Sequence, residues 1–214
     1  MKKNKMKQLE ITLPEARRFL IHYQGLDNSN PWVGERGILE YLKRVGCIQY
    51  DPLNVVGRNP DLVLQSRIPG YSPAVLEKLL YDDRSLIDGW DKMMAIYLRE
   101  DWPLFQRLRK QKGEEIIWIL QYRKSSEALN VTGEVRKILM EKGPLPSTKL
   151  QLGAAGKGRW GHRNLAGAAM DYMFNIGELG IWRKKNSQKI YDLIENLLPR
   201  ELLEAPDPFL REQD

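Results

Sequence analysis

The order of segments after Asn130 constrains the fold of this chain more than any other sequence feature. Apolar residues at helical spacing predict three helices, the first ended by Gly143 and Pro144, and two short strands then flank a turn at Asn186. The predicted helices are 131–142, 147–152 and 163–178, and the predicted strands are 179–185 and 189–193. Three helices followed by a two-stranded hairpin is the order of a winged helix, whose third helix faces DNA and whose hairpin is the wing.

The first half of the chain also has a helical pattern, because residues that favour helix starts precede several apolar stretches. Thr12 and Glu15 have the spacing of a capping box, and Pro14 lies in the first turn. Gly46 is typical of a residue that ends a helix. Further helix starts are predicted at Asn59-Pro60, Ser72-Pro73 and Asp101-Trp102-Pro103.

These patterns predict a mainly α fold with tandem winged-helix units and a short β-hairpin as the wing. We expect a first unit with connecting helices at 8–128 and a second winged-helix unit at 129–198. The acidic residues 199–214, which include Pro206 and Pro208, are predicted to be a linker. Because there is no apolar run long enough to span a membrane and no signal-peptide core, we expect a cytoplasmic protein that does not contact a membrane.

The chain is basic, and its basic residues gather on particular predicted elements. Lys and Arg number 34 against 28 Asp and Glu, and the net charge of +6 favours an anionic partner such as DNA. Residues 142–189 include nine basic residues and two acidic ones. A solvated basic loop is the alternative, but a DNA contact explains why the basic residues fall where a winged helix meets phosphates. The candidates are Arg159, His162 and Arg163 at the start of the third helix and Arg183, Lys184 and Lys185 on the wing.

No pattern in the sequence indicates a metal or a cofactor. Cys47 is the single cysteine, which excludes an intrachain disulfide and a cysteine-based metal site. His22 and His162 are far apart, and the Gly-rich residues 153–158 lack the spacing and the Ser or Thr of a phosphate-binding loop. We therefore expect no metal and no cofactor. We also expect the protein to be a monomer. Roles at helix ends and turns are predicted for Asp82, Asp83 and Asp88.

Gln49 and Asp51 form one local constellation with chemical potential. They are separated by one residue and precede Pro52, which keeps Asp51 out of the helical region. In an extended segment, side chains two residues apart point the same way, so Gln49 and Asp51 face one side and Tyr50 the other. An amide and a carboxylate on one side can hold and polarise a water. From the spacing alone, however, loop residues that cap the next turn are the better interpretation.

The residues around this pair resemble a family of bacterial DNA repair enzymes. The signature region of the YcaQ/AlkZ-type winged-helix DNA glycosylases is similar to Gly46–Val56, Arg58, Leu62-Val63-Leu64 and Ser66-Arg67. Gln49-Tyr50-Asp51 resembles the Gln-x-Asp form of the YcaQ branch, whereas the AlkZ branch has a second Gln. The resemblance continues at 81–84, 90–92, 100–103, 177–179, 191–193 and 199–203.

The resemblance implies excision of alkylated or crosslinked bases from double-stranded DNA. The substrate would be a base alkylated on a ring nitrogen, such as an N7-alkylguanine, which is cationic and leaves readily. Asp51 would stabilise the oxocarbenium-like sugar and act as a base toward water, and Gln49 would orient that water. Asn54, Arg58 and Arg67 would contact DNA. Because no lysine adjoins Gln49 or Asp51 in the sequence, a monofunctional enzyme without a Schiff base is favoured.

The sequence departs from the family pattern in two ways. Family members usually continue with a third winged helix and a small β-barrel, so we expect this chain to be an N-terminal part or a shortened member. Many relatives have a His shortly after the signature Arg, whereas Asn59-Pro60-Asp61 follows Arg58 here. Two other functions stay open: a non-catalytic winged-helix DNA-binding protein such as a regulator, and a protein-interaction module.

Overall fold

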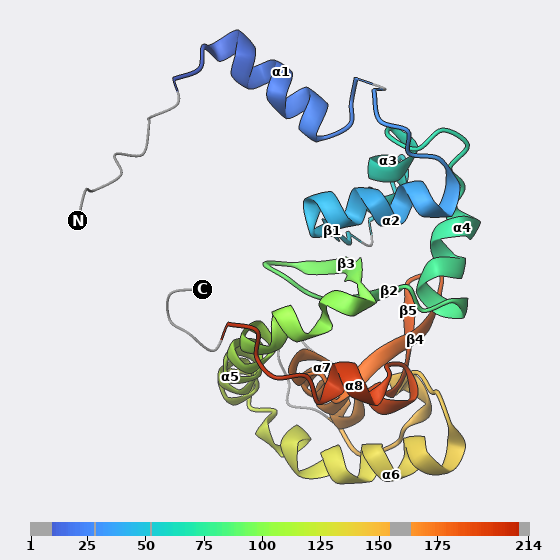
Figure 1. Ribbon diagram of the computed structural model, residues 1–214. Coiled ribbons are helices and arrows are strands. Elements are labelled where there is room, and N and C mark those ends of the chain that lie inside the picture. Colours follow the sequence, from blue (N-terminus) through green and yellow to red (C-terminus); the bar gives the residue numbers. More distant parts are fainter. Residues whose placement is uncertain (1–9, 28, 52, 155–163, 210–214) are drawn as a thin grey trace, which may run out of the picture.

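The computed structural model describes residues 10–27, 29–51, 53–154 and 164–209. The fold is mainly helical, as predicted, and it contains two small antiparallel sheets (Figure 1). The α-helices of the described residues are α1 (Leu13–Tyr23), α2 (Gly34–Val45), α3 (Asn59–Gln65), α4 (Pro73–Glu77), α5 (Gln106–Tyr122), α6 (Thr132–Lys142), α7 (Leu165–Ile176) and α8 (Arg200–Leu203). The strands are β1 (Cys47–Gln49), β2 (Leu86–Trp90), β3 (Met94–Leu98), β4 (Leu179–Lys185) and β5 (Gln188–Leu193).

Capping residues place several helix ends where the sequence predicts them. The backbone N–H of Thr12 donates to the Glu15 carboxylate at 2.7 Å, and Thr12 Oγ1 accepts from the Glu15 N–H, which completes the capping box of α1. α2 ends at Gly46, whose φ of +81° suits a glycine. α7 lies inside the predicted range 163–178, because Asn164 caps its start and Gly177 ends it in the left-handed conformation.

A three-stranded antiparallel sheet in the order β1-β3-β2 is a feature that the sequence patterns do not predict. β2 and β3 are short apolar runs, and periodicity alone does not distinguish such runs from buried helical segments. Gly89 in β2 allows the Tyr97 side chain to approach the backbone of β2 closely, because a Cβ at position 89 would lie 2.3 Å from the hydroxyl oxygen of Tyr97. The tyrosine ring of β3 therefore crosses the backbone of its neighbouring strand.

The second sheet is the predicted hairpin of β4 and β5. Its turn includes Asn186, which has a φ of +56° and is among the residues that tolerate this conformation. Leu145 and Tyr191 exchange two backbone hydrogen bonds of 3.0 Å, which attaches the segment after α6 to β5. α6, a short 3-10 turn at Ser147–Lys149 and α7 precede the hairpin in the predicted order. The assignment of tandem winged helices stays a prediction.

One hydrophobic core joins the two predicted units. Its buried residues extend from Trp32 to Leu193, and α7 contributes nine buried residues to the interior. The packing is therefore continuous across residue 129, and the division of the chain at that position stays a prediction.

Residues 199–209 pack against the body of the protein, although the sequence predicts a linker from residue 199. Leu202 and Leu203 of α8 lie against a second core cluster that includes Trp102. The guanidinium of Arg107 pairs with the Asp207 carboxylate at 2.6 Å. These contacts hold the described part of this segment in place.

Helix α1 stands apart from the rest of the chain (Figure 1). None of its residues is buried, and its apolar side chains, such as Phe19, face solvent. The Tyr23 hydroxyl at its end donates to the backbone carbonyl of Arg44 at 2.8 Å. Neither α1 nor any other helix in the described parts of the chain is long and apolar enough to cross a membrane.

Candidate functional site

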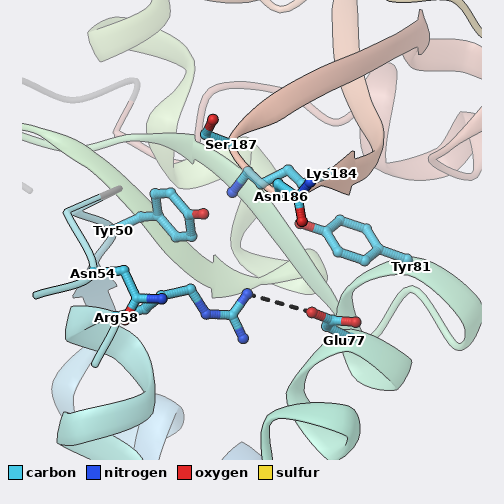
Figure 2. A pocket seen from close by; sticks show the side chains of 8 residues that line it. All are labelled: Tyr50, Asn54, Arg58, Glu77, Tyr81, Lys184, Asn186 and Ser187. Carbon is cyan, nitrogen blue, oxygen red and sulfur yellow. Dashed lines mark hydrogen bonds and ion pairs between the residues drawn. The ribbon is translucent and has the colours of Figure 1, made fainter. Parts of the chain in front are cut away.

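A pocket of about 400 Å³ lies between the first part of the chain and the tip of the β4–β5 hairpin (Figure 2). Its walls come from the end of β1 and the start of α3, from α4 and the following π-helical turn, and from the hairpin. The lining residues are Tyr50, Asn54, Arg58, Glu77, Tyr81, Lys184, Asn186 and Ser187. Because these residues come from three segments far apart in the sequence, the pocket exists only when the hairpin is docked on the first part of the chain.

A buried ion pair between Lys184 and Asp88 docks the hairpin. Lys184 Nζ lies 2.5 Å from Asp88 Oδ1, and the two side chains are only 5% and 1% exposed. The same ammonium lies 3.3 Å from the centroid of the Tyr50 ring, and the Tyr81 hydroxyl donates to Asp88 Oδ2 at 3.2 Å. Burial lowers the pKa of Lys184, an effect that the Asp88 carboxylate opposes. The pair thus ties β4, β2 and the Tyr50 wall of the pocket together.

Arginine contacts beside this ion pair attach the hairpin a second time. Arg84 donates to the backbone carbonyls of Ile181 at 3.0 Å and Trp182 at 2.7 Å. In a second contact, Arg183 of the hairpin pairs with the carboxylate of Asp82, which belongs to the first part of the chain. Burial lowers the pKa of Arg84, which nevertheless remains a cation because the ordinary pKa of its guanidinium is far above neutrality.

Arg58 is fixed on the pocket wall by two carboxylates. Its Nε lies 2.5 Å from Asp61 Oδ2, and its Nη1 lies 3.3 Å from Glu77 Oε1. The Tyr71 hydroxyl donates to the other oxygen of Asp61. The hydrogen bond to Asp61 raises the pKa of Arg58 further. Asp61 therefore orients Arg58 on the pocket wall.

The Gln49–Asp51 segment has the alternation that the sequence predicts. Gln49 is exposed, Tyr50 is buried and Asp51 is half-buried. The Tyr50 N–H donates to the Met94 carbonyl at 2.7 Å, which extends the β1–β3 pairing beyond Gln49. Tyr50 lines the pocket, whereas neither Gln49 nor Asp51 is among the described lining residues. The structure thus places the pair beside this pocket rather than in its wall.

Asp51 also makes the turn-capping contact of the alternative interpretation. Its Oδ1 accepts a hydrogen bond of 2.9 Å from the Leu53 N–H. The structure leaves a catalytic role of Gln49 and Asp51 as a prediction.

The predicted DNA contacts have different surroundings. The DNA contact predicted for Lys184 is wrong, because the Lys184 side chain is buried against Asp88 and is not available to a phosphate. Arg67 donates to the carbonyls of Gln24 and Val63, both at 2.8 Å, and so holds two segments of the fold together. Lys185 is exposed on the hairpin, and Asn54 lines the pocket. Arg159, His162 and Arg163 lie outside the described residues.

A family model described as DNA glycosylase AlkZ-like matches residues 42–213. The chain belongs to the AlkZ-like DNA glycosylase family. A DNA glycosylase is a hydrolase that cleaves the bond between a base and its deoxyribose, so DNA is the substrate class of the family. The matched part of this AlkZ-like chain includes both sheets and the whole pocket, whereas α1 precedes it. No solved structure matches the chain.

Three site residues of the AlkZ-like chain escape the local sequence reading. Glu77 and Tyr81 enter the site only through the tertiary fold, and the helix-end or turn role predicted for Asp88 is wrong, because its carboxylate is buried within β2 and pairs with Lys184. The signal for Asp88 is its position inside the apolar run Leu86–Trp90, because a buried carboxylate in such a strand requires a cationic partner. The sequence does not say which of the many cations that partner is.

Proposed function

We propose that this AlkZ-like chain hydrolyses the N-glycosyl bond of purines alkylated on a ring nitrogen in double-stranded DNA, including crosslinked purines. Alkylation at N7 makes the base cationic, so the base leaves without first being protonated by an acid. Glycoside hydrolysis ordinarily needs both an acid and a second carboxylate. For a cationic leaving base, one carboxylate near the sugar suffices.

The observation that carries this proposal is the half-buried Asp51, which directly follows the pocket-lining Tyr50 in the chain and lies beside the pocket rather than in its wall. The hydrogen bond from the Leu53 N–H to Oδ1 orients the carboxylate, and Oδ2 accepts no hydrogen bond from the described residues. Oδ2 can take a proton from water and oppose positive charge on the sugar. Gln49 projects to the same side of the chain and orients the water.

The pocket has the properties of a receptor for a base removed from the helix. An enzyme that acts on a base in a duplex must bring that base out of the stack into a pocket. The volume of about 400 Å³ is within the usual range for small-molecule sites. Tyr50 and Tyr81 supply aromatic surface, and the Glu77 carboxylate, which Arg58 contacts at 3.3 Å, is the acidic group that a cationic purine would meet. Figure 2 shows Tyr50 on one side of the pocket and Tyr81 and Glu77 on the other.

Water, rather than a lysine, is the nucleophile in this proposal. Lys184 is the lysine among the described lining residues, and its ammonium is engaged by Asp88 and the Tyr50 ring. An amine must be neutral and free to attack the sugar carbon. We therefore favour a monofunctional glycosylase.

Asp51→Asn tests the mechanism, with release of N7-methylguanine from a duplex under single-turnover conditions as the assay. The amide oxygen can still accept from the Leu53 N–H, so the turn is kept while the charge is removed. We expect release to slow about 100-fold, or about 2.7 kcal/mol, with DNA affinity unchanged. Gln49→Ala should slow release less, because water can still enter the site.

The control for this experiment is Asp83→Asn, which alters an exposed aspartate that pairs with Lys78. It should leave release unchanged. Full activity of Asp51→Asn together with unfolding of Asp51→Ala would establish the turn-capping role of Asp51 and remove the mechanism. Tight DNA binding by the wild-type chain with no base release would favour the alternative function of a non-catalytic DNA-binding protein.

A further inference from the structure

The loop between Asp51 and Arg58 presents three large apolar side chains to solvent. Leu53 is 69% exposed, Val55 is 89% exposed and Val56 is 85% exposed. Single exposed apolar residues are common on protein surfaces, but a contiguous group is typical of a binding surface. This group follows directly after Gln49 and Asp51 and adjoins the pocket through Asn54.

The loop is held at both ends, so its apolar side chains are presented from a fixed base. At its start, the Leu53 N–H donates to Asp51 at 2.9 Å. At its end, Asn59 Nδ2 donates to the Gln49 carbonyl at 2.6 Å, which brings the start of α3 against β1. Gly57 has a φ of +150°, and a Cβ there would lie 2.8 Å from a methyl group of Leu62. The chain can therefore close tightly against α3 only with glycine at this position.

Side chains of the loop divide between the pocket and the solvent. Asn54 lines the pocket beside Tyr50 and Arg58 (Figure 2). Its neighbours Leu53 and Val55 are among the exposed apolar residues. The rim of the pocket thus has a polar inner side and an apolar outer side.

We propose that Leu53, Val55 and Val56 form a wedge that enters the base stack of duplex DNA and fills the space left by the extruded base. The inference rests on the proposed function, because it supplies the step that brings the base to the pocket. Extrusion costs unstacking energy, and apolar side chains inserted between base steps offset that cost. The two valines suit this task because β-branched side chains have few rotamers to lose on insertion.

The paired variant Val55→Ser with Val56→Ser tests the wedge. Its substrate is a duplex with one N7-methylguanine, either paired with cytosine or placed in an unpaired bulge. We expect release from the paired site to slow about 10- to 100-fold and release from the bulge to change less than about threefold, because the bulged base is already unstacked. The conservative pair Val55→Ile with Val56→Ile should retain the wild-type rate at both sites.

The matched control is Val33→Ser, which changes a valine that is 65% exposed at the start of α2. It should leave both rates unchanged. The paired variants should have the thermal midpoint of the wild type, whereas serine at the N-cap position of α2 should keep or raise it. Equal slowing at the paired and bulged sites, or no slowing at either, would overturn the wedge. A wild-type dimer that the serine pair converts to a monomer would show that the loop binds a second copy, which also overturns the proposal.

A readout that is independent of chemistry separates this inference from the proposed function. 2-Aminopurine placed next to the lesion becomes brighter when it unstacks. Wild type and Asp51→Asn should both brighten it on binding, and the serine pair should not. A brightening that depends on the valines, in the absence of any base release, would support the wedge while refuting the glycosylase mechanism. An absence of brightening with wild type would overturn the wedge whatever the release rate.

Discussion

Replacement of Lys184 by methionine should destabilise the protein more than any change to a neighbouring residue of the β4–β5 hairpin. Methionine keeps most of the length and the apolar stem of lysine but removes the ammonium. Asp88, whose side chain is 1% exposed, then keeps the Tyr81 hydroxyl as its hydrogen-bond partner and loses its counter-charge. A carboxylate in this position is an uncompensated charge in the interior.

The size of the effect follows from that geometry. Breaking a buried ion pair by removing one partner costs about 3–5 kcal/mol. For a chain of this size, each 1 kcal/mol shifts the thermal midpoint by about 2–4 °C. The midpoint of Lys184→Met should therefore fall by about 6–20 °C, with the smaller values expected if Asp88 takes up a proton.

Urea and thermal unfolding, followed by circular dichroism, measure this loss. Lys185→Met is the matched control, because Lys185 adjoins Lys184 on the hairpin and is exposed. It should change stability by less than about 0.5 kcal/mol. In an Asp88→Asn background, Lys184→Met should cost much less than in the wild type, because no buried charge is left unpaired.

A loss below about 1 kcal/mol for Lys184→Met would refute the reasoning, since it would mean that the Asp88 charge is solvated in solution. Equal costs in the two backgrounds would also refute it, because the destabilisation would then come from lost packing rather than from the ion pair.

Two further predictions concern the Cys47 thiol and the β4–β5 hairpin. Burial, aided by the Asp91 carboxylate, raises the pKa of the Cys47 thiol to about 11, so its reaction with a disulfide reagent at pH 8 should be about 100-fold slower than for an unperturbed thiol and should accelerate as the pH rises toward 11. Asp91→Asn should accelerate the reaction at pH 8, and a rate equal to that of free cysteine would contradict the burial. Replacement of Arg183 and Lys185 by alanine should weaken DNA binding for all sequences and flatten the salt dependence by about one unit per lost phosphate contact. Unchanged affinity and salt dependence would exclude the hairpin from the DNA interface.

Local signals in the sequence predict the helix ends and the hairpin. The capping box of Thr12 and the glycine after α2 act through contacts within a few residues, so they can be read without the fold. The strands around Asn186 are predicted for the same reason. β2 and β3 escape prediction because their apolar runs are buried by tertiary packing and lack a polar-apolar alternation.

In the candidate site, too, local features are predicted from the sequence and tertiary contacts are not. The alternation of Gln49, Tyr50 and Asp51 is a local property of extended backbone, and the structure has it. The environment of Lys184 depends on Asp88, which is 96 positions away in the sequence. A basic residue on a predicted wing has the same local pattern whether it faces a phosphate or a buried carboxylate, so the sequence could not distinguish these two roles.

The hairpin wall of the pocket links ligand binding to a local unfolding equilibrium. Parts of a protein open separately, with free energies below that of global unfolding. If β4 and β5 detach while the helices stay folded, Lys184, Asn186 and Ser187 leave the pocket together. A base held in the pocket binds only the docked hairpin and so reduces the population of the open form. The pocket would then report on the docking of the hairpin, and the strength of the Lys184–Asp88 contact would limit how tightly any base could be held.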